Sequence, residues 1–246
     1  MPTDPTARRP LKSRDRPFFK HLAAALARAG VSPNAISFSS MVFGAAAGLM
    51  LAATSCTMGG VQRFAWLASA IFIQLRLIAN LLDGMVAVEG KRGGPTGELW
   101  NEAPDRVADA LIFVGAGYAA GSSPLLGFGA ALMSVFVAYV RALGASVGAG
   151  QVFIGPMAKP HRMFVMTVLS VAGAIFPKAL SQASASYVAY APNPAALPGL
   201  YQVEVARGHF SLDVTSAVLA VIILGCIVTA LRRLSRIAAF LRSKTL

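Results

Sequence analysis

Long apolar runs alternate with short polar segments along this chain. The runs lie near residues 36–55, 64–82, 107–122, 125–147, 163–177 and 212–231. Several approach the roughly 20 residues that a helix needs to cross the hydrocarbon core of a bilayer. Each run predicts a helix, because the bilayer core offers the backbone no water and because the runs lack the period-two alternation of membrane strands. The pattern therefore predicts an all-α, polytopic membrane protein with six transmembrane helices.

A shorter amphipathic segment precedes the first run. Within residues 17–29, one helical face collects the large apolar side chains Phe18, Phe19, Leu22 and Leu26. Such a face is typical of a helix that lies in the membrane interface. After a stop at Gly30, Ser32 and Pro33 predict the N-cap and first residue of the next helix. The predicted organisation is a disordered basic N-terminus (1–16), an interfacial helix (17–31), a six-helix membrane domain (32–232) and a basic C-terminal tail (233–246).

Composition and charge agree with a membrane location. The chain is 56% hydrophobic and 13% charged, whereas soluble domains carry about a quarter charged residues. Its net charge of +12 raises the question of nucleic-acid binding, which the placement of the charges answers. With a cytoplasmic N-terminus, 18 of the 22 basic residues lie in segments on the cytoplasmic side, and only Arg63, Lys178 and Arg207 lie on the opposite side. This excess of positive charge predicts that both termini face the cytoplasm at the inner membrane. The basic ends would then attract anionic membrane lipid, and we expect no nucleic-acid partner.

Acidic residues concentrate around the junction of the second and third runs. Of the ten in the chain, those between residues 83 and 109 are Asp83, Glu89, Glu98, Glu102, Asp105 and Asp109. Charged groups at a membrane helix are costly and need partners or water. One interpretation is a cytoplasmic loop made acidic for solubility. The other is a site that binds a positive species.

Helical spacing favours the second interpretation. One face at the end of the second run carries Asn80, Asp83, Gly84 and Ala87, and one face at the start of the third carries Gly97, Asn101 and Asp105. The short Gly-rich connection at 89–97 makes the two helices antiparallel neighbours whose faces can meet. Clustered oxygen ligands suit Mg²⁺, Mn²⁺ or Ca²⁺. The glycines leave room for a ligand or for the facing helix.

These residues resemble a known signature. The stretch N-x-x-D-G-x-x-A at 80–87, followed by G-x-x-x-N-x-x-x-D at 97–105, is similar to the D-x-x-D-G-x-x-A-R and G-x-x-x-D-x-x-x-D of the CDP-alcohol phosphatidyltransferases. The continuation at 105–109, D-R-V-A-D, resembles the D-R-x-x-D of several members. A bacterial branch with N-x-x-D-G-M and G-x-x-x-N-E-x-x-D is more similar still. The specific part of the resemblance covers about 30 residues, and the six-helix plan extends it over the whole chain.

The resemblance implies an enzyme of phospholipid biosynthesis. It would transfer a phosphatidyl group from a CDP-linked donor, CDP-diacylglycerol or another CDP-alcohol, to an alcohol acceptor and release CMP. Its metal, Mg²⁺ or Mn²⁺, would lie among Asn80, Asp83, Asn101 and Asp105, with Asp105 as the catalytic base. The nucleotide would lie against Gly84, Ala87 and Gly97. A phosphate on the acceptor would contact Arg141, Lys159 and Arg162. Family members are commonly dimers, so a homodimer is expected.

The chain departs from the signature at three positions. Asn80 and Asn101 replace aspartates, and Val88 stands where the family has arginine. Two carboxylates are thereby lost, so Glu102 becomes a candidate to supply negative charge, and one metal fits as well as two. Arg106 is a candidate for the diphosphate contact of the missing arginine, as are Lys91 and Arg92.

Other interpretations remain open from sequence. The basic residues Arg141, Lys159 and Arg162 also suit ordinary anchoring on the cytoplasmic side, and Asp109 suits a pair with Arg106. Arg76, within a run, needs a partner, either structural or a lipid phosphate. A donor carrying choline or ethanolamine on CDP is a close variant of the transferase. The asparagines favour a catalytically impaired relative that binds nucleotide or lipid as a regulator or scaffold. A transporter is the third class, although two matching broken helices are not evident.

Overall fold

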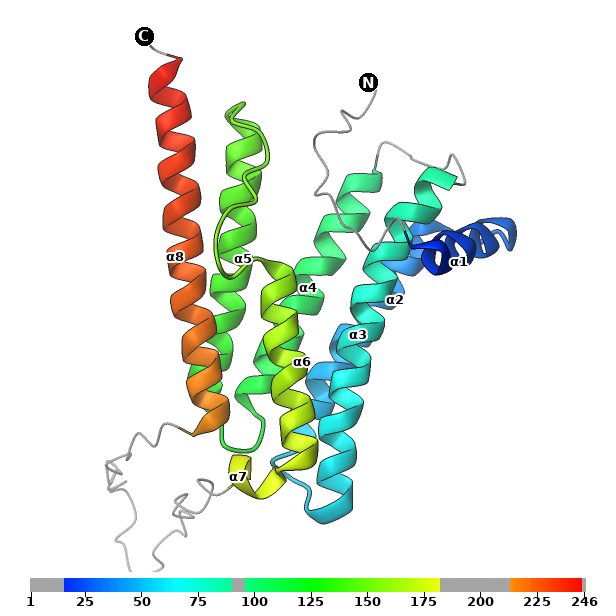
Figure 1. The fold of residues 1–246 in the computed structure, drawn as a ribbon, viewed down its shortest axis with the longest axis vertical. Helices are drawn as coiled ribbons and strands as arrows, with labels where there is room; N and C mark the ends of the chain where they lie inside the picture. The colour runs from blue at the N-terminus through cyan, green and yellow to red at the C-terminus, as the bar shows by residue number, and fades with distance from the viewer. Residues whose placement is uncertain (1–15, 90–95, 182–212, 245–246) are drawn as a thin grey trace, which may run out of the picture.

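The computed structural model describes residues 16–89, 96–181 and 213–244, all helical or in short connections. All but the last residue of the predicted disordered N-terminus (1–16) falls outside these residues, as do Lys91, Arg92 and Arg207. Figure 1 labels the described helices, which are α1 (Pro17–Arg28), α2 (Pro33–Ala53), α3 (Gly59–Glu89), α4 (Gly97–Gly117), α5 (Pro124–Ser146), α6 (Lys159–Ile175), α7 (Pro177–Ser181) and α8 (Val214–Ser243).

The long helices form a bundle, with α1 projecting outward beside the C-terminal half of α3 and the short α7 near the opposite end (Figure 1). Helix α2 packs against both α3 and α4, while α5 packs against α4 and α8, and α6 packs against α3. The C-terminal end of α3 and the N-terminal end of α4 lie at the same end of the bundle as α1 (Figure 1). The two motif-bearing segments are therefore gathered at one end.

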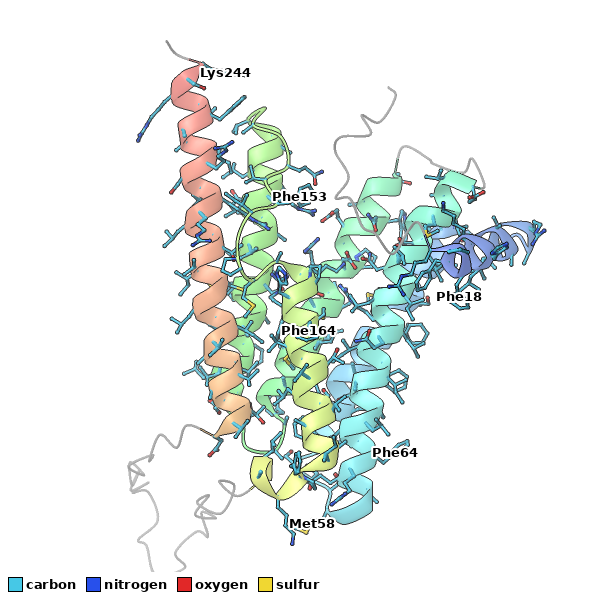
Figure 2. The ribbon with its side chains drawn as sticks, viewed as in Figure 1. Phe18, Met58, Phe64, Phe153, Phe164 and Lys244 are labelled. Carbon is cyan, nitrogen blue, oxygen red and sulfur yellow. The ribbon has the colours of Figure 1, made fainter. Side chains whose placement is uncertain are left out.

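Four of the described helices are long and apolar enough to cross a membrane, namely α2, α3, α5 and α8. Large apolar side chains are exposed on these helices and on α1, α4 and α6. Figure 2 labels three of them, Phe64 on α3, Phe18 on α1 and Phe164 on α6. Soluble monomers rarely expose large contiguous apolar patches. The prediction of an all-α fold with several membrane-crossing helices is confirmed for the described residues, and the count of six remains a prediction.

Small residues bring α2 and α4 into close contact. A Cβ added at Gly44 would lie 2.7 Å from the Cβ of Ala108, and one at Gly115 would overlap the backbone of Gly48. In a lipid environment, where apolar burial against neighbours gains little over lipid tails, such close backbone approach is a main source of helix association. The tight α2–α4 pair fixes the position of α4, and with it the position of Asp105.

Helix α2 begins as the sequence predicts. Ser32 is the N-cap, its hydroxyl accepts a hydrogen bond from the Ala35 backbone N–H at 3.1 Å, and Pro33 opens the helix. The preceding helix ends before Gly30, which adopts a φ of 80°. This cap satisfies one of the backbone donors that a helix start leaves unpaired.

The apolar face of α1 packs against protein. Phe19, Leu22 and Leu26 lie against a cluster that includes Ala79, Leu82 and Val86 of α3, whereas Phe18 is exposed. The face predicted for lipid therefore also braces the motif-bearing end of α3.

Two element boundaries differ from the sequence interpretation. Helix α6 begins at Lys159, so Lys159 and Arg162 lie on its first turn and not in a loop. Extended backbone at Ala158 and a proline in the first turn set this start. Helix α8 continues without a break from Val214 to Ser243, so the described part of the basic tail is the last turns of a long helix.

Candidate active site

The end of α3 presents the first half of the site. Asp83 is buried, its Oδ2 accepts a hydrogen bond of 2.7 Å from the Ser37 hydroxyl on α2, and its Oδ1 accepts one of 2.5 Å from the Gly84 backbone N–H. These two donors hold the carboxylate in one orientation. Asn80 lies one turn earlier on the same helix.

Ser37 is a residue that the sequence did not single out. It lies 46 positions before Asp83 in the chain, and its contact depends on the packing of α2 against α3. The only local signal is a small polar residue one turn into an apolar helix. Such residues in membrane helices commonly form interhelical hydrogen bonds, but the pattern does not say with which partner.

The start of α4 presents the second half. Asn80 Nδ2 lies 3.4 Å from Asn101 Oδ1, which joins the two motif segments directly. Asp105, one turn after Asn101, is buried, and its Oδ1 accepts a hydrogen bond of 3.0 Å from Arg76 of α3. Asp83 and Asp105 thus belong to the two segments that Asn80 and Asn101 bring together. The two helical faces therefore meet around a small polar volume.

Lys159, the first residue of α6, completes this centre. Its Nζ donates to Asn80 Oδ1 at 2.7 Å and forms an ion pair with Asp105 Oδ2. Its side chain is largely buried, and Asp83 lies within its electrostatic range. One positive charge thus lies where oxygens from α3 and α4 converge.

A second group of charges surrounds Asp109, one turn after Asp105 on α4. Asp109 is fully buried, with Oδ1 2.5 Å from Arg76 Nη2 and Oδ2 3.2 Å from Arg162 Nη2. Arg162 also donates to the Met157 carbonyl at 2.9 Å. Nε and Nη1 of Arg76 and Nε of Arg162 are buried and find no partner in the described part of the chain. Asp109 therefore pairs with Arg76 and Arg162, and the ion pair expected with Arg106 does not form.

Glu102 is engaged away from this centre. Both of its oxygens lie 2.6 Å from Arg141 Nη2 of α5, and Oε2 lies 2.6 Å from Arg106 Nη2. Burial raises the pKa of Glu102, but the charges of Arg106 and Arg141 outweigh it and hold the pKa below its ordinary value. Its predicted metal role remains a prediction, and the carboxylate is already matched by two cations.

The remaining motif residues line the same end. Gly84 and Ala87 are half-buried on α3. A Cβ added at Gly97 would meet nothing within 4 Å among the described residues, so helix packing does not require a glycine there. The predicted roles of Gly84, Ala87 and Gly97 toward a nucleotide remain predictions.

Carboxylate side chains alone do not form a metal site at this end of the described bundle. The described residues contain no group of three or more His, Cys, Asp or Glu side chains that could hold a metal ion. Amide oxygens add further donors, because Asn80 Oδ1 and Asp105 Oδ2 converge on the Lys159 ammonium. Oxygens that converge on one cation suit a hard divalent ion as well. Asn80 Oδ1 and Asp105 Oδ2 therefore define a cation position that the Lys159 ammonium holds in this structure, and the metal role of the four motif residues remains a prediction.

Comparison with known proteins places the chain. Models of known protein families give no match. Archaetidylinositol phosphate synthase of Aeropyrum pernix is 32% identical over 130 residues, which is 50% of this chain and 66% of that protein. The chain belongs to the CDP-alcohol phosphatidyltransferase family. The match spans about two thirds of the archaeal synthase.

Solved structures agree on the fold of this phosphatidyltransferase relative. The CDP-DAG-bound phosphatidylinositol phosphate synthase of Mycobacterium tuberculosis superposes with a TM-score of 0.62 at 16% identity, covering 90% of this chain and 94% of that one. The same enzyme with manganese and citrate also gives 0.62 at 16% identity, with coverage of 89% and 88%. At this identity the likeness concerns the fold alone.

Proposed function

We propose that this phosphatidyltransferase-family protein transfers a phosphatidyl group from CDP-diacylglycerol to an alcohol, with Mg²⁺ or Mn²⁺ as cofactor and CMP as the other product. The observation that carries the proposal is the meeting of the two motif segments, where Asn80 Nδ2 of α3 lies 3.4 Å from Asn101 Oδ1 of α4, one turn before the buried Asp105. Asp83 lies one turn after Asn80 on α3, in an orientation fixed by Ser37 and the Gly84 N–H. The relationship to an archaeal synthase of the same family supports the same activity.

The proposed metal ligands are Asn80, Asp83, Asn101 and Asp105. When bound, the metal would neutralise charge on the donor's phosphates, which is the main requirement of phosphoryl transfer. Glu102 is left out of this set because its oxygens already accept from Arg106 and Arg141. Arg106, one turn after Glu102 on α4, is proposed to contact the donor's diphosphate. It would take over the role of the signature arginine, whose position on α3 is occupied by Val88.

Asp105 is proposed as the base. The acceptor oxygen forms a bond to the phosphorus of the phosphatidyl group, the bond from that phosphorus to the CMP oxygen breaks, and the acceptor proton passes to an Asp105 oxygen. Arg76 holds Oδ1 at 3.0 Å, so Oδ2 is the oxygen for proton transfer once Lys159 releases it. Arg76 thus positions the carboxylate.

A phosphate on the acceptor alcohol is proposed to lie near Arg141 and Arg162. Arg162 retains a buried Nε without a partner among the described residues, which is free to donate to an anion. Arg141 reaches the same end of the bundle through Glu102 and lies over the ring of Phe153 at 5.8 Å. Figure 2 shows Phe153 at that end. Guanidinium groups suit phosphate because they offer several donors in a fixed plane.

The proposed topology has six membrane helices, α2 to α6 and α8, with α1 in the interface and both termini in the cytoplasm. Helix α3 is ~46 Å long at ~1.5 Å per residue, against a core of ~30 Å, so its motif-bearing end extends to the inner surface. Cys56, between α2 and α3, is exposed, and Cys226 is buried. A membrane-impermeant maleimide should therefore label Cys56 in right-side-out vesicles and not in sealed inverted ones. The reverse pattern would contradict the orientation.

The activity test uses the purified full-length chain in detergent or liposomes. Incubation with labelled CDP-diacylglycerol, Mn²⁺ and a panel of free and phosphorylated alcohols should release CMP with at least one acceptor. Treatment with EDTA should abolish the release, because nothing then neutralises the donor's phosphates, and added Mg²⁺ or Mn²⁺ should restore it. A well-folded preparation that releases no CMP from CDP-diacylglycerol, CDP-choline or CDP-ethanolamine would count against the proposal.

One observation favours a second candidate, a catalytically impaired relative that binds nucleotide or lipid. Both Asp105 oxygens are engaged, one by Arg76 and one by Lys159. A carboxylate held in this way is stabilised as an acceptor and is a weaker base. This candidate predicts binding of CMP or CDP-lipid without turnover.

A further inference from the structure

Lys159 contacts both motif segments through one ammonium group. Its Nζ donates to Asn80 Oδ1 on α3 at 2.7 Å and pairs with Asp105 Oδ2 on α4. It reaches them from the first residue of a third helix, α6, 54 positions after Asp105. The ammonium lies inside the site and its side chain is 19% exposed. Ordinary anchoring at the membrane surface would leave such a charge in water.

The remaining charges of this end are already matched. Asp109 is paired with Arg76 and Arg162, and Glu102 with Arg106 and Arg141. Asp105 is itself paired with Arg76 and Lys159, which leaves Asp83 as the carboxylate of the centre without an ion pair among the described side chains. These four carboxylates already face five cationic side chains, so the site has negative charge for at most one divalent cation. A second divalent cation would have only the neutral amides of Asn80 and Asn101 to face, with a like charge on Lys159 beside it.

We propose that the site holds one divalent cation and that the Lys159 ammonium, held by Asn80 and Asp105, supplies the positive charge at the second cation position. The ligands proposed for the remaining metal then narrow to Asp83, Asn101 and Asp105. The inference rests on the proposed function. It explains the two asparagines and Lys159 together. An amide oxygen accepts a hydrogen bond from an ammonium without adding a charge, so Asn80 suits Lys159 where an aspartate would suit a metal. The positive charge that a second metal would bring is then part of the chain.

The test is the number and affinity of bound Mn²⁺, measured on the purified full-length protein by equilibrium binding and by electron paramagnetic resonance. The wild-type protein should bind one Mn²⁺ with the six-line spectrum of an isolated ion. Lys159→Met should bind Mn²⁺ about tenfold or more tightly, because a like charge a few ångströms from the metal is removed. Lys159→Arg should keep the wild-type affinity and stoichiometry, and Lys20→Met, on exposed α1, is the matched control.

A triple variant gives the converse. Asn80→Asp with Asn101→Asp and Lys159→Met restores two carboxylates and removes the ammonium. It should bind two Mn²⁺ and give the broadened spectrum of a coupled pair. Two Mn²⁺ in the wild-type protein, or an unchanged affinity in a monodisperse Lys159→Met, would overturn the inference. If the wild type binds two Mn²⁺ and releases CMP, this inference fails while the proposed function stands. If neither the wild type nor any of the variants binds Mn²⁺ and no CMP is released, the inference and the proposed function both fail.

Discussion

Replacement of Asp105 by asparagine should reduce the rate of CMP release by about 10²- to 10⁴-fold, the range over which a positioned base accelerates proton transfer. Asparagine keeps the size of the side chain and one oxygen. It cannot take the acceptor proton, and its amide would place a donor against either Arg76 or Lys159, both of which are donors to Asp105 in the native protein. The measurement is the initial rate with saturating CDP-diacylglycerol and the best acceptor found.

Glu89→Gln is the control for this variant. Glu89 is the last residue of α3 and is exposed, so the substitution removes one acidic charge from the same end without touching the described contacts of the centre. Its rate should stay within about twofold of the wild type. Binding of CMP, measured in the same preparations, should survive in Asp105→Asn. If Asp105→Asn keeps more than about a tenth of the wild-type rate, Asp105 is not the base, and a normal phenotype of that variant in cells would favour the non-catalytic relative.

Replacement of Asp109 by asparagine should lower the free energy of unfolding by about 3–5 kcal/mol, the usual cost of removing one partner from a buried ion pair. Asp109 is fully buried and accepts from both Arg76 and Arg162. The variant would leave Arg162 without an anionic partner, hydrogen-bonded to the Met157 carbonyl, and Arg76 paired with Asp105 alone. Equilibrium unfolding in mixed micelles, with increasing SDS and helicity as the signal, measures the difference.

Glu102→Gln is the matched comparison, because Glu102 also lies between two arginines but its side chain is 44% exposed. Ion pairs in contact with water contribute about 0–1 kcal/mol. This variant should therefore unfold close to the wild type. Equal stability of the two variants would show that the Asp109 group does not hold α3, α4 and α6 together. A loss of activity without a loss of stability in Asp109→Asn would instead assign it to the chemistry.

Local sequence patterns determined the helices of this protein and the registry of its motif. Apolar runs that match the bilayer marked the positions of the membrane helices, and Ser32 with Pro33 marked the start of α2, because both depend on neighbours within a few residues. Spacings of three and four residues placed Asn80 with Asp83, and Asn101 with Asp105, on shared helical faces. The resemblance to a family signature used the same local information, and it led to the family and to the proposed chemistry.

The tertiary structure alone decided the partners of those side chains. Ser37 meets Asp83 across 46 residues, and Lys159 meets Asp105 across 54. Asp109 pairs with Arg76 and Arg162, although Arg106 is nearer in sequence. Such contacts depend on how α2 and α6 pack beside α3 and on where α6 begins, which no local periodicity encodes. A charge in a poorly solvated interior takes the partner that packing brings to it, whatever its distance along the chain.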